Sequence, residues 1–214
     1  MSTPLAIVDY GLGNLFSLQI AMKSIGYESK ISSDKKVLDS AERIILPGVG
    51  AFGAGMRNLE KDALSCVIKN YAERGRPILG ICLGMQLLME SSEEEKGIDG
   101  LSLVDGEVKK LNQIDNIEHM LKIPQVGWNK INFSKQRTSW KNTILDGLEE
   151  NSFFYFVHSY AAQTKKLENS LALTQYGITE FSSVVTKGNI SGTQFHPELS
   201  GPQGLKILKN FMKI

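Results

Sequence analysis

The chain of 214 residues carries 24 basic and 23 acidic side chains, so its formal net charge at pH 7 is only +1. This balance gives no electrostatic footprint for nucleic acid or for a membrane surface. No apolar run approaches the ~20 residues needed to span a bilayer, and residues 1–11 lack the pattern of a signal peptide. Two cysteines are too few for a disulfide framework. We therefore expect a cytoplasmic protein that binds neither nucleic acid nor membrane.

The first hundred residues alternate short apolar runs with amphipathic segments. Strands are predicted over residues 5–10, 43–46 and 78–81. Helices are predicted over residues 15–25, 56–74 and 83–89, the first capped by Asn14 and ended by Gly26. Strands that alternate with helices in this way are typical of a parallel sheet covered on both faces.

The pattern changes after about Gly97, where short apolar runs are separated by Gly, Asn, Asp and Ser. These runs predict further strands, many of them antiparallel, over residues 100–111, 128–133, 152–160, 170–176, 181–186 and 189–195. Residues 201–214 predict a closing amphipathic helix. With no linker, repeat or low-complexity tract, we expect one domain over residues 1–214. Its fold class is α/β: a flavodoxin-like, doubly wound, mostly parallel sheet with additional antiparallel strands.

Cys82 lies between a predicted strand and a predicted helix, with Gly80 and Gly84 two residues to either side. This pattern is a nucleophile elbow with cysteine in place of serine. The sharp turn forces the nucleophile into a strained backbone and needs small neighbours, and the start of a helix favours a thiolate. The alternative is a small buried hydrophobic residue. This is our interpretation of Cys66, which lies within the predicted helix 56–74 in register with Leu59 and Ala63 and has no flanking glycines.

A thiolate nucleophile needs a base, and the base needs a group that orients it. His196 follows an apolar strand and stands two residues before Glu198. A carboxylate beside an imidazole fixes its tautomer and stabilises the imidazolium. We expect a Cys82–His196–Glu198 triad. His158 is interpreted as a core or site-lining residue and His119 as a surface residue.

Two glycine-rich loops are candidate cofactor sites, and neither fits a known binding motif. Residues 47–53 lack the Lys-Ser/Thr of a P-loop, and residues 11–16 have Phe16 in place of the third glycine of a dinucleotide fingerprint. We expect no cofactor, and since no Cys/His spacing suits zinc we expect no metal. We interpret residues 47–50 as a wall that supplies a backbone amide to an oxyanion beside that of Leu83. An ordinary turn remains the alternative.

The segments GICLGMQLL and QFHPE resemble the nucleophile and His/Glu motifs of the class I glutamine amidotransferases. Together with VDYGLGNLFS, LPGVGAFGAGMRNL, GWN and YFVHSY, they are similar to the glutaminase subunits of imidazole glycerol phosphate synthase. The matching segments are spread over residues 8–198. The resemblance implies that Cys82 attacks the amide of glutamine, and that His196, held by Glu198, transfers the proton to departing ammonia.

The resemblance also implies a set of substrate-binding residues. Gly50 and Leu83 would bracket the oxyanion, Gln86 and Glu94 would hold the amino-acid end of glutamine, and Ser159 and Tyr160 would line the pocket. Periodicity alone favours other interpretations of two of them. It makes Gln86 a helix-surface residue and Glu94 part of a solvated acidic run, residues 93–95.

The family implies a partner. Its glutaminases form heterodimers with a (β/α)8-barrel cyclase, which uses channelled ammonia to make imidazole glycerol phosphate and aminoimidazole carboxamide ribotide for histidine biosynthesis. This chain departs from the family at Leu199, where lysine is usual, and at Gln125, where histidine is frequent. Two alternatives therefore stay open. One is a paralogous glutaminase that serves another acceptor enzyme, such as one that aminates a bacterial surface sugar. The other is a non-catalytic binding subunit, which the intact triad argues against.

Overall fold

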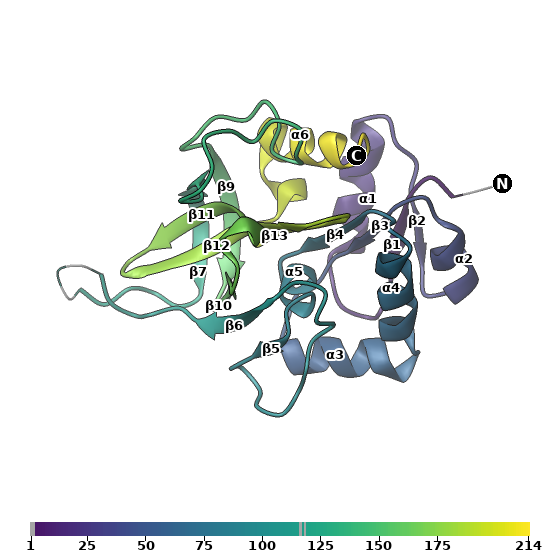
Figure 1. Cartoon of the computed structure of the whole chain (residues 1–214), viewed down its shortest axis with the longest axis horizontal. Helices are drawn as coiled ribbons and strands as arrows, with labels where there is room; N and C mark the ends of the chain where they lie inside the picture. The colour runs from purple at the N-terminus through teal and green to yellow at the C-terminus, as the bar shows by residue number, and fades with distance from the viewer. Residues whose placement is uncertain (1–2, 116, 118) are drawn as a thin grey trace.

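The computed structural model describes residues 3–115, 117 and 119–214, and an eight-stranded sheet runs through its centre (Figure 1). The strands of this sheet are β1 (Ala6–Val8), β2 (Lys30–Ser32), β3 (Ile44–Leu46), β4 (Ile78–Ile81), β8 (Asn132–Phe133), β11 (Ser170–Tyr176), β12 (Thr179–Lys187) and β13 (Ile190–Thr193). Their spatial order is β2-β1-β3-β4-β13-β12-β11-β8.

The first five strands in this order, β2 to β13, are parallel, and the remaining three are antiparallel. The parallel part has the flavodoxin-like strand order 2-1-3-4-5 if β13 is counted as the fifth strand. The predicted fold class is confirmed. The pairing of β13 with β4 also carries the chain that follows β13 to the end of β4, beside Cys82.

Two smaller sheets are attached to the central one (Figure 1). β5 (Ser91–Ser92), β6 (Gly106–Lys110) and β10 (Tyr160–Thr164) form a three-stranded sheet. β7 (Gln125–Lys130) and β9 (Phe153–His158) form an antiparallel pair. Side chains of β9 alternate: Phe154 and Phe156 are buried in the core, while Phe153 and Val157 are exposed on the outer face, as expected for a strand with one solvated face.

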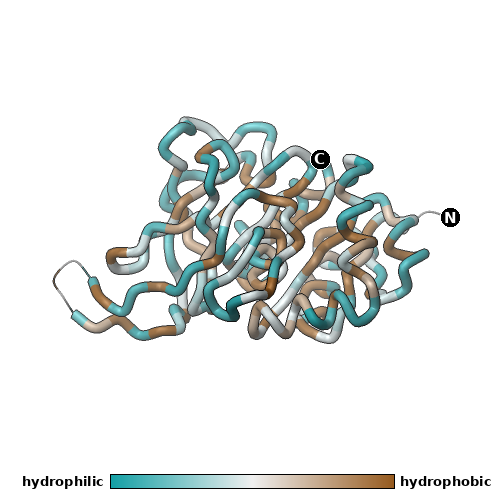
Figure 2. Tube along the Cα trace, turned by 60° about the horizontal axis from the view of Figure 1, so that its bottom comes forward, coloured by the Kyte–Doolittle hydropathy of each residue, from teal (hydrophilic) through white to brown (hydrophobic). Residues whose placement is uncertain are grey.

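Helices cover both faces of the central sheet. α1 (Leu15–Ser24) and α6 (Gly201–Phe211) pack on one face. α2 (Lys35–Ser40), α3 (Phe52–Lys61), α4 (Leu64–Glu73) and α5 (Leu83–Leu87) pack on the other. In β1, Ile7 faces the first group while Ala6 and Val8 face the second, so the strand is apolar in both directions. Figure 2 shows the hydrophobic stretches gathered inside the molecule and hydrophilic ones at its edges.

Helix α1 confirms the predicted start and stop signals. The Asn14 side chain accepts a hydrogen bond from the Ser17 N–H at 3.2 Å, and Gly26 just beyond the helix has φ +89°. No helix among the described residues is long and apolar enough to cross a membrane.

The helix predicted over residues 56–74 was wrong. Two helices cover this stretch, and Ala63 between them adopts φ +51°, which ends α3 and turns the chain into α4 (Figure 1). The interpretation of Cys66 was wrong for the same reason: it assumed one continuous helix, whereas the break changes the register, and Cys66 is exposed on α4. β2 and α2 were not predicted, because an exposed three-residue edge strand and a six-residue helix show little periodicity.

Candidate active site

Cys82 occupies the sharp turn between β4 and α5, with φ +52° and ψ −110°. A residue other than glycine rarely adopts these backbone angles, so the turn is strained and must be held by its surroundings. The backbone N–H of Cys82 donates to the Thr193 carbonyl of β13 at 2.7 Å, which fixes the turn to the neighbouring strand.

The two flanking glycines are required by close backbone contacts. A Cβ on Gly84 would lie 1.7 Å from the Leu46 carbonyl oxygen, and one on Gly80 would lie 2.8 Å from the Gly84 carbonyl oxygen. Neither position accepts a side chain without backbone movement. The strand–turn–helix geometry predicted for the elbow is therefore present, and it lifts the sulfur above the edge of the parallel sheet.

His196 and Glu198 follow β13 and form a buried pair. Nδ1 of His196 lies 2.9 Å from Oε1 of Glu198, and each side chain is only 5% exposed. The His196 backbone is held twice, because its N–H donates to the Tyr155 carbonyl and its own carbonyl accepts from the Ser200 hydroxyl. The carboxylate favours a proton on Nδ1, which leaves Nε2 as the nitrogen that could accept one. Nε2 is buried and has no hydrogen-bond partner among the described residues.

Burial alone would lower the pKa of His196, but interactions with Cys82 and with Glu198 outweigh it and raise this pKa above its usual value. A carboxylate behind a histidine and a sulfur in front of it is the arrangement that supports a thiolate–imidazolium pair.

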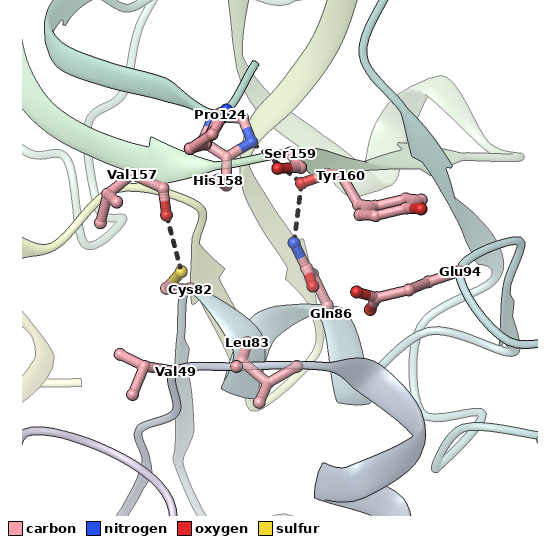
Figure 3. A pocket seen from close by; sticks show the side chains of 11 residues that line it. Val49, Cys82, Leu83, Gln86, Glu94, Pro124, Val157, His158, Ser159 and Tyr160 are labelled. Carbon is pink, nitrogen blue, oxygen red and sulfur yellow. Dashed lines mark hydrogen bonds between the residues drawn. The ribbon is translucent and has the colours of Figure 1, made fainter.

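A pocket of about 260 Å³ opens beside the sulfur (Figure 3). Its walls include Cys82 and all six of the predicted substrate-binding residues: Gly50, Leu83, Gln86, Glu94, Ser159 and Tyr160. Four further residues complete the lining: Val49, Pro124, Val157 and His158. His196 and Glu198 are not among the residues that line this pocket.

Gln86 and Glu94 depart from what periodicity alone favoured. Gln86 is buried, and its amide nitrogen donates to the Tyr160 carbonyl at 2.8 Å. Glu94 points toward the pocket in Figure 3, and its Oε2 accepts from the Phe52 N–H at 2.8 Å. An amide and a carboxylate a few residues apart in sequence thus face one cavity because α5 and the turn after β5 converge there.

One of the two predicted oxyanion donors, the backbone N–H of Leu83, already has a hydrogen-bond partner in the structure. The Leu83 N–H donates to the Gly48 carbonyl at 3.3 Å, so this amide is already engaged. The Tyr10 hydroxyl donates to the neighbouring Pro47 carbonyl at 2.7 Å. Burial, followed by the nearby Cys82, raises the pKa of Tyr10, which keeps the hydroxyl a donor. Tyr10 and Leu83 therefore hold two successive carbonyls of the loop 47–50.

His158 lines the pocket, as one of its two predicted roles required. Burial lowers its pKa from 6.5 to about 4, against a smaller opposite effect of the hydrogen bond between Nδ1 and the Tyr160 carbonyl at 2.9 Å. Gln125, opposite His158 in the β7–β9 pair, is buried, so the departure at Gln125 lies inside the protein. His119 is exposed, as predicted.

Sequence reasoning missed three groups near the sulfur. They are the Tyr10 hydroxyl, the side chain of Gln194 and the Val157 carbonyl, the last two each 3.8 Å from the Cys82 sulfur. Gln194 stands inside the QFHPE segment and could have been singled out there. The other two have no sequence signal, because only the sheet order brings them to the elbow. No group of three potential metal ligands is found within the described part of the chain.

Known proteins resemble this chain along nearly its whole length. The model of the class-I glutamine amidotransferases matches residues 6–214, and the chain belongs to that family. Among its relatives is the imidazole glycerol phosphate synthase subunit HisH of Methanosarcina barkeri, 46% identical over 97% of each chain. The protein of the same name from Bacillus cereus is 45% identical over 98% of this chain and 94% of its own.

Solved structures with low sequence identity share the fold. The structure of PurLQS from Thermotoga maritima covers 100% of this chain and 99% of its own, at 21% identity with a TM-score of 0.71. A glutamine amidotransferase structure covers 98% of this chain and 97% of its own, at 17% identity with a TM-score of 0.72.

Proposed function

We propose that this chain is the glutaminase subunit of an imidazole glycerol phosphate synthase, acting as one domain over residues 1–214. The observation that carries the proposal is the strained Cys82, which lines a pocket and lies next to the segment that holds the buried His196–Glu198 pair. Relatives 43–46% identical over 97–98% of the chain, all named as HisH subunits of that synthase, support the choice of pathway.

The chemistry has two halves. In the first, the Cys82 thiol passes its proton to Nε2 of His196 as its sulfur forms a bond to the side-chain carbonyl carbon of glutamine, giving a tetrahedral oxyanion. His196 gives its Nε2 proton to the nitrogen as the C–N bond breaks, so ammonia leaves and a glutamyl thioester remains. In the second, water attacks the thioester carbon, His196 takes the proton from the water, and the C–S bond breaks to release glutamate. Glu198 stabilises the imidazolium in both halves.

Glutamine is held by the groups that converge on the pocket. Glu94 offers a carboxylate to the α-ammonium group, and Gln86, Ser159 and Tyr160 line the remaining walls. Such a pocket places the amide carbon in front of the sulfur and avoids the entropy cost of a bimolecular encounter.

Leu83 and Gly50 supply the oxyanion amides in this proposal. For the Leu83 N–H to reach the oxyanion, its hydrogen bond to the Gly48 carbonyl has to open. A glycine at position 48 allows the wide range of backbone angles that such a turn needs, and its packing against the Tyr10 hydroxyl and the Cβ of Leu83 leaves no room for a side chain there. The active arrangement therefore requires the peptide between Gly48 and Val49 to reorient.

The partner surface in this proposal is the outer face of β7–β9, defined by Val126, Trp128, Phe153 and Val157. All four are exposed apolar side chains, with Trp128 at 56%, and contiguous apolar surface of this kind marks interaction sites. Val157 also lines the pocket, so a (β/α)8-barrel cyclase seated here would receive ammonia a short distance from the sulfur. Leu199, exposed after His196, adds apolar area where the family usually has lysine.

The experiment measures glutamate release from glutamine, with and without the cognate cyclase subunit and its nucleotide ligand. Cys82→Ala is expected to abolish release, while Cys66→Ala, the matched control on the exposed face of α4, keeps the activity. Undiminished turnover in Cys82→Ala would overturn the proposal. Absence of glutamate release and of thiol labelling by a glutamine-analogue electrophile, even with the partner present, would favour a non-catalytic subunit.

The acceptor is tested by complementation. Growth of a histidine auxotroph that lacks its own glutaminase subunit, on glutamine-derived nitrogen and with the cognate cyclase supplied, is the expected result. Failure to grow despite measurable glutaminase activity would point to another acceptor enzyme.

A further inference from the structure

The Cys82 sulfur has two hydrogen-bonding neighbours, the Val157 carbonyl and the side-chain amide of Gln194. The Val157 carbonyl, at 3.8 Å, can only accept, so it favours the protonated thiol. The amide nitrogen of Gln194, also at 3.8 Å, can donate, so it favours the thiolate. The sulfur thus has one contact that stabilises each protonation state.

The direction of the Gln194 amide is fixed by a chain of hydrogen bonds that begins at the backbone. The Tyr160 carbonyl can only accept, so the nitrogen of Gln86 must face it, at 2.8 Å. The same nitrogen donates to Oε1 of Gln194 at 3.3 Å. With its oxygen directed to Gln86, Gln194 must present its N–H group to the Cys82 sulfur.

Gln194 is also immobilised. It is fully buried, its backbone N–H donates to the Ser183 carbonyl at 2.9 Å, and it lies between β13 and His196. A donor held in this way does not have to reorganise when charge appears on the sulfur, which is the condition under which buried dipoles contribute most to catalysis. Hydrogen bonds in sites without ligand are often long and tighten when substrate is bound.

We propose that Gln194 is a further residue of the catalytic site, whose side-chain N–H donates to the Cys82 thiolate and whose orientation is set by Gln86 in the glutamine pocket. The inference rests on the function proposed above, in which Cys82 is the nucleophile. It assigns Gln86 a second task, since loss of its amide would let Gln194 turn its oxygen toward the sulfur. Glutamine recognition and the state of the nucleophile therefore share one hydrogen-bond chain.

The test follows the rate of alkylation of Cys82 by iodoacetamide as a function of pH, without the partner. All variants carry Cys66→Ala, so that Cys82 is the one thiol left to react. Gln194→Met keeps the volume and removes the donor. We expect the pH midpoint of alkylation to rise by about one unit, and kcat with the partner to fall on the order of 10-fold with KM within about two-fold.

Thr174→Val is the matched control, because Thr174 is fully buried and donates to the Lys130 carbonyl at 2.8 Å. It removes a buried hydrogen bond without touching the pocket and should leave the pH midpoint unchanged. An unchanged midpoint and kcat in Gln194→Met, alongside an active parent, would overturn this inference alone. An inactive parent would overturn the proposed function instead.

A second measurement needs no substitution of Gln194. In the Cys66→Ala protein, the side-chain amide resonances of Gln194 should shift over the pH range in which Cys82 becomes reactive, and should stay constant after Cys82→Ala. Resonances that do not respond to pH in the parent would contradict the hydrogen bond even if Gln194→Met fails to fold.

Discussion

Two groups of residues near Cys82, the His196–Glu198 pair (the base side) and the Leu83 amide with the loop 47–50 (the oxyanion side), differ in how far the fold of the chain alone places them for the proposed reaction. On the base side, His196 and Glu198 are buried and bonded at 2.9 Å, and the backbone of His196 is anchored to β9. On the oxyanion side, the Leu83 N–H is engaged by the Gly48 carbonyl. In the function proposed above, the base belongs to a short segment tied to the sheet, whereas the oxyanion amide of Leu83 is engaged by a glycine-rich loop that also contains Gly50. In that proposed function, a partner that activates the enzyme would act on the loop and leave the base unchanged.

The largest effect is expected from a substitution that disrupts the His196–Glu198 pair. Glu198→Gln keeps the shape but removes the charge that stabilises the His196 imidazolium and fixes its tautomer, so kcat should fall by about 10³-fold. The loss should be equal with and without the partner, because the partner does not act on this side. Steady-state glutamate release measures it.

Glu95→Gln is the control for that substitution, since Glu95 is half exposed and pairs with Arg57 outside the pocket. It should leave kcat within about two-fold. A partner that restores the activity of Glu198→Gln would contradict the division between the two sides.

A smaller effect concerns stability. Burial lowers the pKa of His158 to about 4, so between pH 6.5 and 4 the unfolded chain binds a proton that the folded protein does not. The free energy of unfolding should therefore fall as the pH drops through this window, by up to about 1.4 kcal/mol per pH unit from this group. Urea unfolding at several pH values should show that the free energy of unfolding depends less steeply on pH in His158→Asn than in the unsubstituted protein. The exposed His119→Asn should keep the slope, and equal slopes for all three proteins would refute the assignment.

The smallest effect is expected from a substitution that loosens the loop 47–50 on the oxyanion side. Tyr10→Phe leaves the Pro47 carbonyl without its donor and loosens the loop that engages Leu83. We expect the glutaminase kcat without the partner to rise about 5-fold, and the stimulation by the partner to shrink accordingly. Tyr71→Phe is the matched control, because Tyr71 is also buried and donates to a backbone carbonyl, that of Ala41, away from the site. A fall in the activity of Tyr10→Phe would show that this bond supports the active loop instead.

Local sequence patterns were enough to predict much of the fold and part of the site. The strand Ile78–Ile81, the helix that begins at Leu83 and the glycines around Cys82 follow from steric rules that act within a few residues, and the structure agrees with them. The helices around Ala63 did not follow, because a left-handed residue in an ordinary sequence gives no signal. Gln86 and Glu94 were placed in the pocket by family resemblance, whereas their periodicity suggested solvent.

The sequence by itself determined that Cys82 stands in a glycine-flanked elbow and that His196 precedes Glu198 by two residues, because these features depend on neighbours along the chain. The tertiary structure decided that the two segments meet, since β13 returns to lie parallel beside β4 across more than a hundred residues. It also decided that Tyr10 holds the loop 47–50 and that Gln194 faces the sulfur. Hydrogen bonds between residues so distant in sequence depend on the order of strands in the sheet, which no local pattern contains.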